Sequence, residues 1–155
     1  MPHSLNVQYR LATRMDVPAI VRLLAEDNLG AQRERFETPL PAPYYAAFEA
    51  IDADPNNELI VAHANEEIIG TLQLMFLPHL SHQGGMRAQV SSVRVAEQFR
   101  GQGIGTDMMK WVLERARERG CLLMQLTSSK SRTDAHRFYE KLGFEKTNIG
   151  MKIKL

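Results

Sequence analysis

The sequence has one cysteine, one tryptophan and no long apolar run, and its charges nearly cancel. With Cys121 alone, no disulfide can form within the chain, which suits a reducing compartment. A net charge of +1 lacks the basic excess typical of nucleic-acid binders. No stretch is apolar over the roughly 20 residues that a membrane-spanning helix needs, and no signal-peptide pattern is visible. We therefore expect a cytoplasmic protein with neither nucleic acid nor a membrane as partner.

The length of 155 residues, with 44% hydrophobic and 24% charged residues, favours one globular domain over residues 1–155. Alternating and apolar runs predict strands at 7–12, 58–64, 68–77, 87–95 and 122–127. Helical periodicity predicts helices beginning near 17, 44, 103 and 134. One or two further strands are expected within 145–155. The alternation in 87–95 predicts that residues 89, 91, 93 and 95 share one face of the sheet.

A glycine-rich segment, Arg-Gly-Gln-Gly-Ile-Gly from Arg100 to Gly105, follows the apolar strand predicted over 87–95 and precedes a predicted helix. Glycines at a helix start leave unpaired N–H groups and the positive end of the helix dipole open to a ligand. Such a terminus suits a phosphate, and Arg100 adds a fixed positive charge. We interpret the segment as a pyrophosphate-binding loop.

Three other interpretations of this loop are possible from its residues. A dinucleotide-binding fingerprint needs a glycine or alanine where Thr106 stands, and a nucleoside-triphosphate loop needs a lysine that is absent here. A tight turn with close helix packing, without any ligand, is the structural alternative. The loop alone does not decide between this turn and a phosphate site.

A second motif, Ala135-His136-Arg137-Phe138-Tyr139-Glu140-Lys141-Leu142-Gly143-Phe144, follows a helix and a short strand after the loop. Together the two motifs, over residues 87–144, resemble the GNAT superfamily of N-acetyltransferases. The resemblance implies an α+β fold with one central, mixed and mostly antiparallel sheet. This sheet would have about six to seven strands, flanked by about four helices, and would be splayed between strands 4 and 5. It also implies acetyl-CoA as acyl donor and a homodimer.

The resemblance places the pyrophosphate of acetyl-CoA on Arg100, Gly103 and Gly105. Beside the splayed strands, backbone groups of residues 93–95 would pair with the pantetheine arm. The predicted cofactor-binding residues are Val93, Arg94, Val95, Arg100, Gly101, Gln102, Gly103, Ile104, Gly105 and Thr106.

Tyr139 stands at the family's usual general-acid position, and a phenol is protonated at neutral pH and can donate to a leaving thiolate. Ser91 stands where many members carry the glutamate that deprotonates the amine. A serine hydroxyl is no base at neutral pH, although it can orient a water molecule. Three explanations stay open: another carboxylate (Glu34 or Glu37) serves, solvent takes the proton, or the protein binds acetyl-CoA with little catalysis.

The acceptor site is expected in the charged, proline-rich segment after the first helix, because the family commonly uses this region. The predicted substrate contacts are Arg33, Glu34, Phe36 and Glu37. No metal site is predicted, since His79 and His82 lack further ligands nearby. The predicted function is transfer of an acetyl group from acetyl-CoA to a primary amine in a direct ternary complex. The alternative is a non-catalytic acetyl-CoA or CoA sensor, and a DNA-binding regulator finds little support.

Overall fold

The computed structural model describes residues 5–155. Its strands are β1 (Gln8–Leu11), β2 (Asn57–Ala64), β3 (Glu67–Leu77), β4 (Arg87–Val95) and β5 (Leu123–Gln125). Its helices are α1 (Val17–Leu24), α2 (Asn28–Arg33), α3 (Ala42–Asp52), α4 (Ser81–Gly84), α5 (Ile104–Glu118) and α6 (Thr133–Lys141), and two 3-10 turns are η1 (Arg14–Asp16) and η2 (Glu97–Phe99). The chain up to Gln125 forms one compact unit and Leu126–Leu155 a second, and each is described by itself.

The first unit is built on one mixed sheet with the strand order β1-β2-β3-β4-β5. The first four strands pair antiparallel, and β5 joins β4 in parallel. This confirms the predicted α+β class and the mostly antiparallel sheet, with fewer strands than the six to seven expected. The two helices beyond the predicted four are short, since α2 has six residues and α4 has four.

The parallel pair is brief. β5 pairs with β4 only from Arg87 to Gln89, whereas β4 continues to Val95 and pairs with β3 along that length. Among the strands of residues 5–155, the later part of β4 therefore has a partner on one edge alone. This is the expected splay between strands 4 and 5, and it leaves one edge of β4 without a strand partner beside Val93 and Val95.

A β-bulge interrupts β4 at Ser92. Thr71 of β3 pairs with Arg94 and Gln73 pairs with Ser91, so the two intervening residues of β4 stand opposite one residue of β3. Ser92 adopts φ 53°, in the left-handed region. Because an extra residue shifts the alternation, the predicted face of 89, 91, 93 and 95 is wrong beyond the bulge, where Arg94 takes the face of Ser91.

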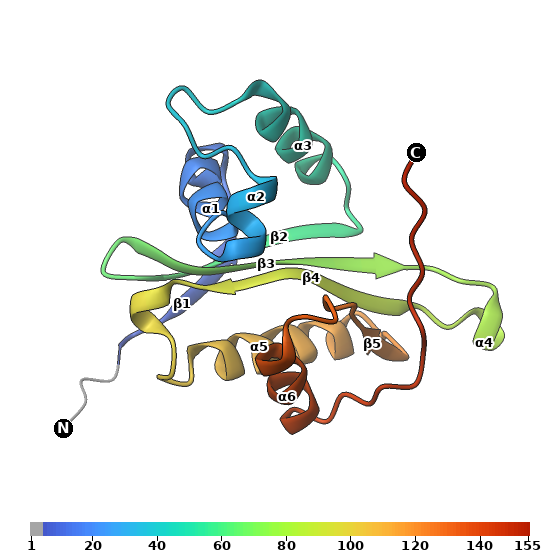
Figure 1. Ribbon diagram of the computed structural model, residues 1–155. Coiled ribbons are helices and arrows are strands. Elements are labelled where there is room, and N and C mark those ends of the chain that lie inside the picture. Colours follow the sequence, from blue (N-terminus) through green and yellow to red (C-terminus); the bar gives the residue numbers. More distant parts are fainter. Residues whose placement is uncertain (1–4) are drawn as a thin grey trace. The chain divides into compact units, whose positions relative to one another are not determined.

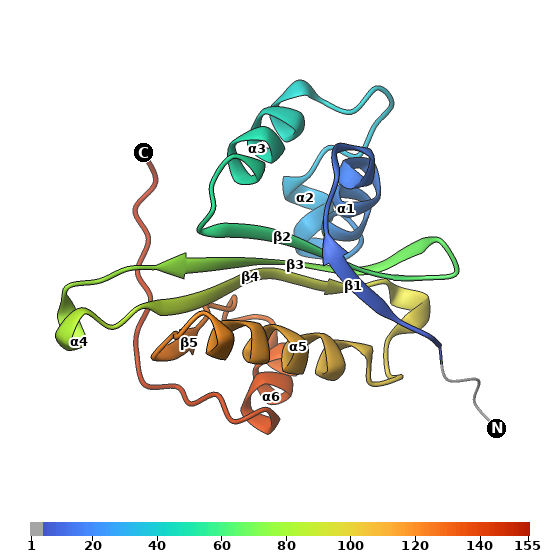
Figure 2. The same ribbon diagram turned by 180° about the vertical axis from the view of Figure 1, so that it is seen from behind.

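Helices cover both faces of the sheet (Figures 1 and 2). Within the first unit, α1, α2 and α3 lie on one face and α5 lies on the other. The core under α1 and α3 is aliphatic and aromatic, and it includes Val21, Leu23, Phe48 and Val61. Helix α5 buries one stripe of side chains at helical spacing, namely Ile104, Met108, Met109, Val112 and Ala116. This packing fixes the start of α5 relative to β4.

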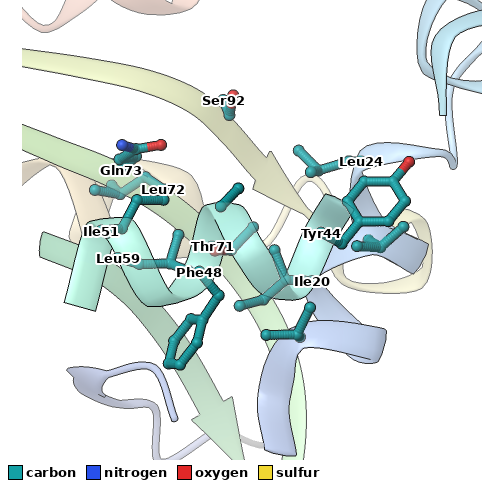
Figure 3. A pocket seen from close by; sticks show the side chains of 13 residues that line it. Ile20, Leu24, Tyr44, Phe48, Ile51, Leu59, Thr71, Leu72, Gln73 and Ser92 are labelled. Carbon is teal, nitrogen blue, oxygen red and sulfur yellow. The ribbon is translucent and has the colours of Figure 1, made fainter. Parts of the chain in front are cut away.

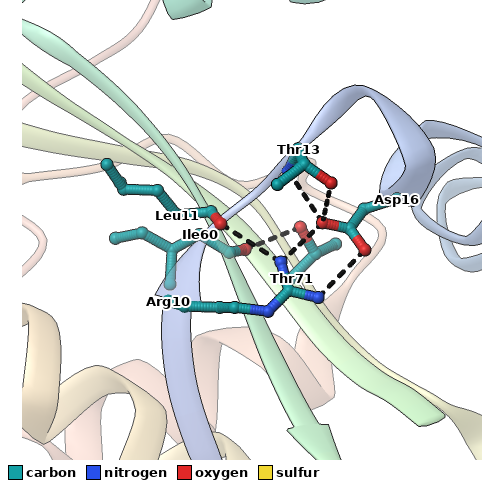
Figure 4. Close-up of polar contacts among 6 residues, drawn as sticks. All are labelled: Arg10, Leu11, Thr13, Asp16, Ile60 and Thr71. Atoms are coloured by element: carbon teal, nitrogen blue, oxygen red, sulfur yellow. Dashed lines mark hydrogen bonds and ion pairs between the residues drawn. The ribbon is translucent and has the colours of Figure 1, made fainter. Parts of the chain in front are cut away.

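A polar network joins β1 to the start of α1 (Figure 4). Both terminal nitrogens of Arg10 donate to the carboxylate of Asp16, over 2.6 and 3.0 Å. The same carboxylate accepts from the backbone N–H of Thr13 at 2.7 Å, so Thr13 and Asp16 form a capping box. The hydrogen bonds to Arg10 chiefly lower the pKa of Asp16, against the opposing effect of burial.

The second unit contains α6, and in it Tyr139 packs edge-on against Phe138 and Phe144, with ring centroids 5.1 and 5.8 Å apart. The helix matches the prediction closely. The strands expected within 145–155 are absent from the described chain: this segment pairs with no strand and leaves Ile149 and Met151 86% and 89% exposed. Extended backbone becomes a strand only where another strand supplies hydrogen bonds.

Candidate active site

The glycine loop connects the splayed end of β4 to the start of α5. Gly101 and Gly103 adopt φ 77° and 81°, whereas Gln102 between them does not have a positive φ. Left-handed residues that alternate with right-handed ones turn successive N–H groups to one side of the chain, an arrangement that binds anions. An L-residue is strained at such angles, so these two glycines are required by the backbone.

The start of α5 offers unpaired donors. The first intrahelical bond runs from the N–H of Asp107 to the carbonyl of Gly103, over 3.0 Å. The N–H groups of Ile104, Gly105 and Thr106 precede it, where a helix has no carbonyl partner of its own. Together with the helix dipole they form the partial positive charge that suits a phosphate.

The side chain of Arg100 is exposed and anchored beside this terminus. Its Nε donates to the carbonyl of Val95 at 3.0 Å, and its backbone N–H donates to the backbone carbonyl of Glu97 at 3.2 Å. The bond to Val95 holds the guanidinium at the end of β4, next to the loop. The structure thus brings together in one unit all the predicted cofactor-binding residues: Val93, Arg94, Val95, Arg100, Gly101, Gln102, Gly103, Ile104, Gly105 and Thr106.

A largely apolar cavity of about 130 Å³ lies between α1, α3 and the sheet (Figure 3). Ser92, at the bulge, belongs to its wall, so the cavity reaches the strand that leads to the glycine loop. The lining residues are Val17, Ile20, Val21, Leu24, Tyr44, Ala47, Phe48, Ile51, Leu59, Thr71, Leu72, Gln73 and Ser92. None of these thirteen side chains carries a formal charge at neutral pH.

Tyr44 connects the cavity to the predicted substrate segment. Its hydroxyl donates to Glu34 Oε1 at 2.9 Å and accepts from the backbone N–H of Arg35 at 2.9 Å. Burial is the largest cause that raises the pKa of Tyr44; the N–H of Arg35 opposes the rise and Glu34 adds to it. The hydroxyl is therefore protonated at neutral pH and presents a carboxylate beside the cavity wall.

The four predicted substrate residues lie in different surroundings. Arg33 ends α2 and is exposed, Phe36 is 51% exposed, and Glu37 pairs with Arg35 at 2.7 Å on the surface. Only Glu34 is linked by a described hydrogen bond to a residue of the cavity wall. The sequence analysis did not predict the cavity. A signal was present, because the α3 residues in its wall, Tyr44, Ala47, Phe48 and Ile51, stand at positions i, i+3, i+4 and i+7 and so share one helix face.

The two predicted catalytic residues lie in different units. Ser91 is half-buried on β4, opposite Gln73 of β3. Tyr139 lies on α6 in the second unit, so its role rests on the resemblance alone. Within residues 5–155, no group of three His, Cys, Asp or Glu side chains is placed to hold a metal ion, and no helix is long and apolar enough to cross a membrane.

Comparison with protein families identifies the class. The family model described as acetyltransferase (GNAT) family matches residues 21–144, which is most of the chain. The chain therefore belongs to the GNAT acetyltransferase family, and the resemblance read from its two motifs is confirmed. The match begins within α1 and ends just after α6, so it includes the glycine loop and Tyr139.

Two curated relatives share about a third of their aligned residues with the chain. The aminoalkylphosphonate N-acetyltransferase of Salmonella typhimurium is 34% identical over 66% of this chain and 66% of its own length. The glucosamine 6-phosphate N-acetyltransferase of Trypanosoma brucei brucei is 32% identical over 57% of this chain and 58% of its own length. The chain thus spans less than two thirds of these relatives. Family and relatives together support the predicted class, an acyl-CoA-dependent N-acetyltransferase.

A solved structure from Bacillus halodurans C-125, described as a transcriptional regulator, is 51% identical to the chain. The match covers 97% of this chain and 100% of that one, with a TM-score of 0.94. The fold described above is therefore also that of an experimentally determined structure over nearly the whole length.

Proposed function

We propose that the protein transfers the acetyl group of acetyl-CoA to the primary amine of a small-molecule acceptor, by direct attack in a ternary complex. The observation that carries this proposal is the glycine loop, where Gly101 and Gly103 hold left-handed angles directly before the unpaired N–H groups of α5. This geometry supports a pyrophosphate site, and family membership supports acetyl-CoA as its ligand. A single domain over residues 1–155 and a homodimer belong to the same proposal.

The donor would lie along the open edge of β4. Backbone groups of Val93 and Val95 would pair with the amide groups of the pantetheine arm, as a neighbouring strand would. Arg100 would add its charge to the pyrophosphate, while its Nε stays bonded to Val95. The thioester would then lie upstream along β4, toward the bulge at Ser92.

The amine nitrogen attacks the thioester carbonyl, the C–S bond breaks, and the coenzyme leaves as a thiolate that needs a proton. Tyr139 would supply this proton from its hydroxyl. Direct attack also agrees with the state of Cys121. Burial chiefly raises the pKa of the Cys121 thiol, which disfavours the thiolate that an acyl-enzyme route would need.

The amine must also lose a proton, and Ser91 cannot take it as a base at neutral pH. Glu34 is the better placed of the two candidate carboxylates, because it is hydrogen-bonded to a residue of the cavity wall, whereas Glu37 pairs with Arg35 on the surface. We propose that Ser91 orients a water molecule and that this water passes the proton toward Glu34 or solvent.

Release of free coenzyme A against a panel of amines tests the reaction. We expect turnover with at least one primary amine and a loss of kcat of at least tenfold in Tyr139→Phe, with Tyr45→Phe as the matched control. Glu34→Gln should lower the rate and change its pH profile, whereas Glu37→Gln should not. Turnover that Tyr139→Phe leaves intact would contradict the assigned general acid.

The second candidate is a coenzyme A-binding regulatory module with little catalysis. It is favoured by Ser91 at the position where many family members carry a glutamate, and by the description of the 51% identical Bacillus halodurans protein as a transcriptional regulator. Acetyl-CoA binding without turnover on any amine would favour this candidate. Light scattering on purified protein tests the proposed homodimer.

A further inference from the structure

Three of the four polar side chains in the cavity wall, Tyr44, Thr71 and Gln73, already have hydrogen-bond partners. The Thr71 hydroxyl donates to the carbonyl of Ile60 at 2.9 Å, and the Gln73 amide donates to Asn57 at 2.8 Å. The Tyr44 hydroxyl is bonded to Glu34 and Arg35. The surface that a ligand would contact inside the cavity is mainly aliphatic and aromatic. The part of a ligand that enters the cavity therefore gains binding free energy by burying apolar area.

The absence of charge from this wall discriminates between acceptor classes. A phosphate or phosphonate group in the cavity would lose water without gaining a cationic partner, because none of the thirteen lining residues is Lys or Arg. The two curated relatives are named for acceptors that carry such groups. The cavity of this chain is therefore suited to a different kind of amine.

The cavity also has a defined size and direction. At about 130 Å³ it is close to the cavities of about 150 Å³ that bind benzene when lined by aliphatic and aromatic side chains. Ser92 in its wall directly precedes Val93, where the proposed donor site begins. In Figure 3 the polar ends of Tyr44, Gln73 and Ser92 lie on one side of the aliphatic group. An amine held at this polar side would direct its apolar tail among the aliphatic side chains.

We propose that the acceptor is a primary amine whose nitrogen carries an apolar tail of about the size of a phenyl ring, and that this tail occupies the cavity. The inference rests on the proposed acetyl transfer and names its substrate class. The carboxylate of Glu34, hydrogen-bonded to Tyr44 of the wall, attracts the ammonium form of the amine to this part of the cavity. The aliphatic face of α1 and the α3 side chains Ala47, Phe48 and Ile51 hold the tail.

Calorimetric binding of probe amines, with and without coenzyme A, tests the cavity directly. We expect 2-phenylethylamine to bind at least tenfold more tightly than 2-aminoethylphosphonate. In the series from methylamine to butylamine, affinity should rise by about fourfold for each methylene group buried. An affinity that stays flat along this series, or tighter binding of the phosphonate, would overturn the inference.

Two alanines of α3 provide a matched pair of variants. Both alanines are exposed, but Ala47 lines the cavity and Ala46, on the same helix, does not. Ala47→Leu should weaken 2-phenylethylamine binding at least tenfold, and Ala46→Leu should leave it within twofold. Equal effects of the two variants, once circular dichroism shows that both are folded, would overturn the assignment. The alkylamine series on the unmodified protein remains decisive if Ala47→Leu does not fold.

The charge at the polar side is tested separately. Glu34→Gln should weaken 2-phenylethylamine binding while leaving its neutral analogue 2-phenylethanol unchanged, and an equal loss for both would contradict the role of Glu34. Failure of the proposed acetyl transfer differs from failure of the proposed substrate class, because it would appear as no coenzyme A binding and no turnover. Turnover of polar amines that is insensitive to Ala47→Leu would overturn only the substrate class.

Discussion

Gly103 and Gly120 stand at the two ends of α5 and allow strain to be separated from ligand binding. Gly103 is the N-terminal cap with φ 81°, and Gly120 follows the C-terminal cap with φ 77°. A Cβ added at either position would meet no atom within 4 Å. Alanine at either site therefore introduces backbone strain and no steric clash within the protein.

The cost of this strain can be worked out for both sites. An alanine in the left-handed region destabilises the folded state by about 1–2 kcal/mol. Alanine also reduces the conformational entropy of the unfolded chain, which offsets this strain by about 0.4–1 kcal/mol. We expect Gly103→Ala and Gly120→Ala each to destabilise the fold by about 1 kcal/mol, which lowers Tm by about 2–4 °C in a chain of this size. Urea unfolding and thermal scans measure both values.

The two variants should differ in acetyl-CoA affinity. In Gly103→Ala a methyl group occupies the open space at the loop, and relaxation of φ turns the N–H groups away from the phosphates. We expect the dissociation constant measured by calorimetry to rise at least tenfold in Gly103→Ala, against less than twofold in Gly120→Ala. Equal affinities for the two variants would refute the assignment of the loop as the pyrophosphate site.

Three further predictions concern the scaffold. Arg115→Met leaves the Glu58 side chain, 9% exposed, without its bidentate ion pair, and should cost about 2–3 kcal/mol by urea unfolding, between the values for exposed and buried pairs. Arg10 lowers the folded pKa of Asp16, so the stabilisation from Asp16 is present above its unfolded pKa of about 3.9 and is lost as pH falls through the folded value. Asp16→Asn should therefore flatten the acid limb of the stability curve. Met108→Ala, at a site with 0% exposure, should cost about 2–5 kcal/mol in the same unfolding assay.

Local sequence pattern predicted most of the sheet. The bounds of β4, Arg87–Val95, agree with its apolar run, and the pair β2 and β3 follows from two apolar runs separated by a short polar turn. The alternation failed at Ser92, because a bulge depends on how two strands pair and leaves no mark in the local pattern. The same dependence explains residues 145–155, whose alternation suits a strand but finds no partner within its unit.

The sequence predicted the glycine loop of the candidate site but not the cavity. The loop could be predicted because Gly101 and Gly103 adopt left-handed backbone angles, which favour glycine, and closely spaced glycines are visible in the sequence. The cavity could not, since its walls come from α1, α3 and three strands, and each residue there reads locally as ordinary core. The sequence does not show that Tyr44 binds Glu34 beside this cavity, because the two residues are ten positions apart and meet only in the folded chain.

We propose that the backbone at the start of α5 holds the pyrophosphate of acetyl-CoA. The most direct measurement is an NMR titration of the backbone amides with coenzyme A. We expect the largest shifts at the backbone amides of Gly101, Gly103, Ile104, Gly105 and Thr106. Saturable coenzyme A binding that leaves these amides unshifted, or no binding at all, would contradict this proposal.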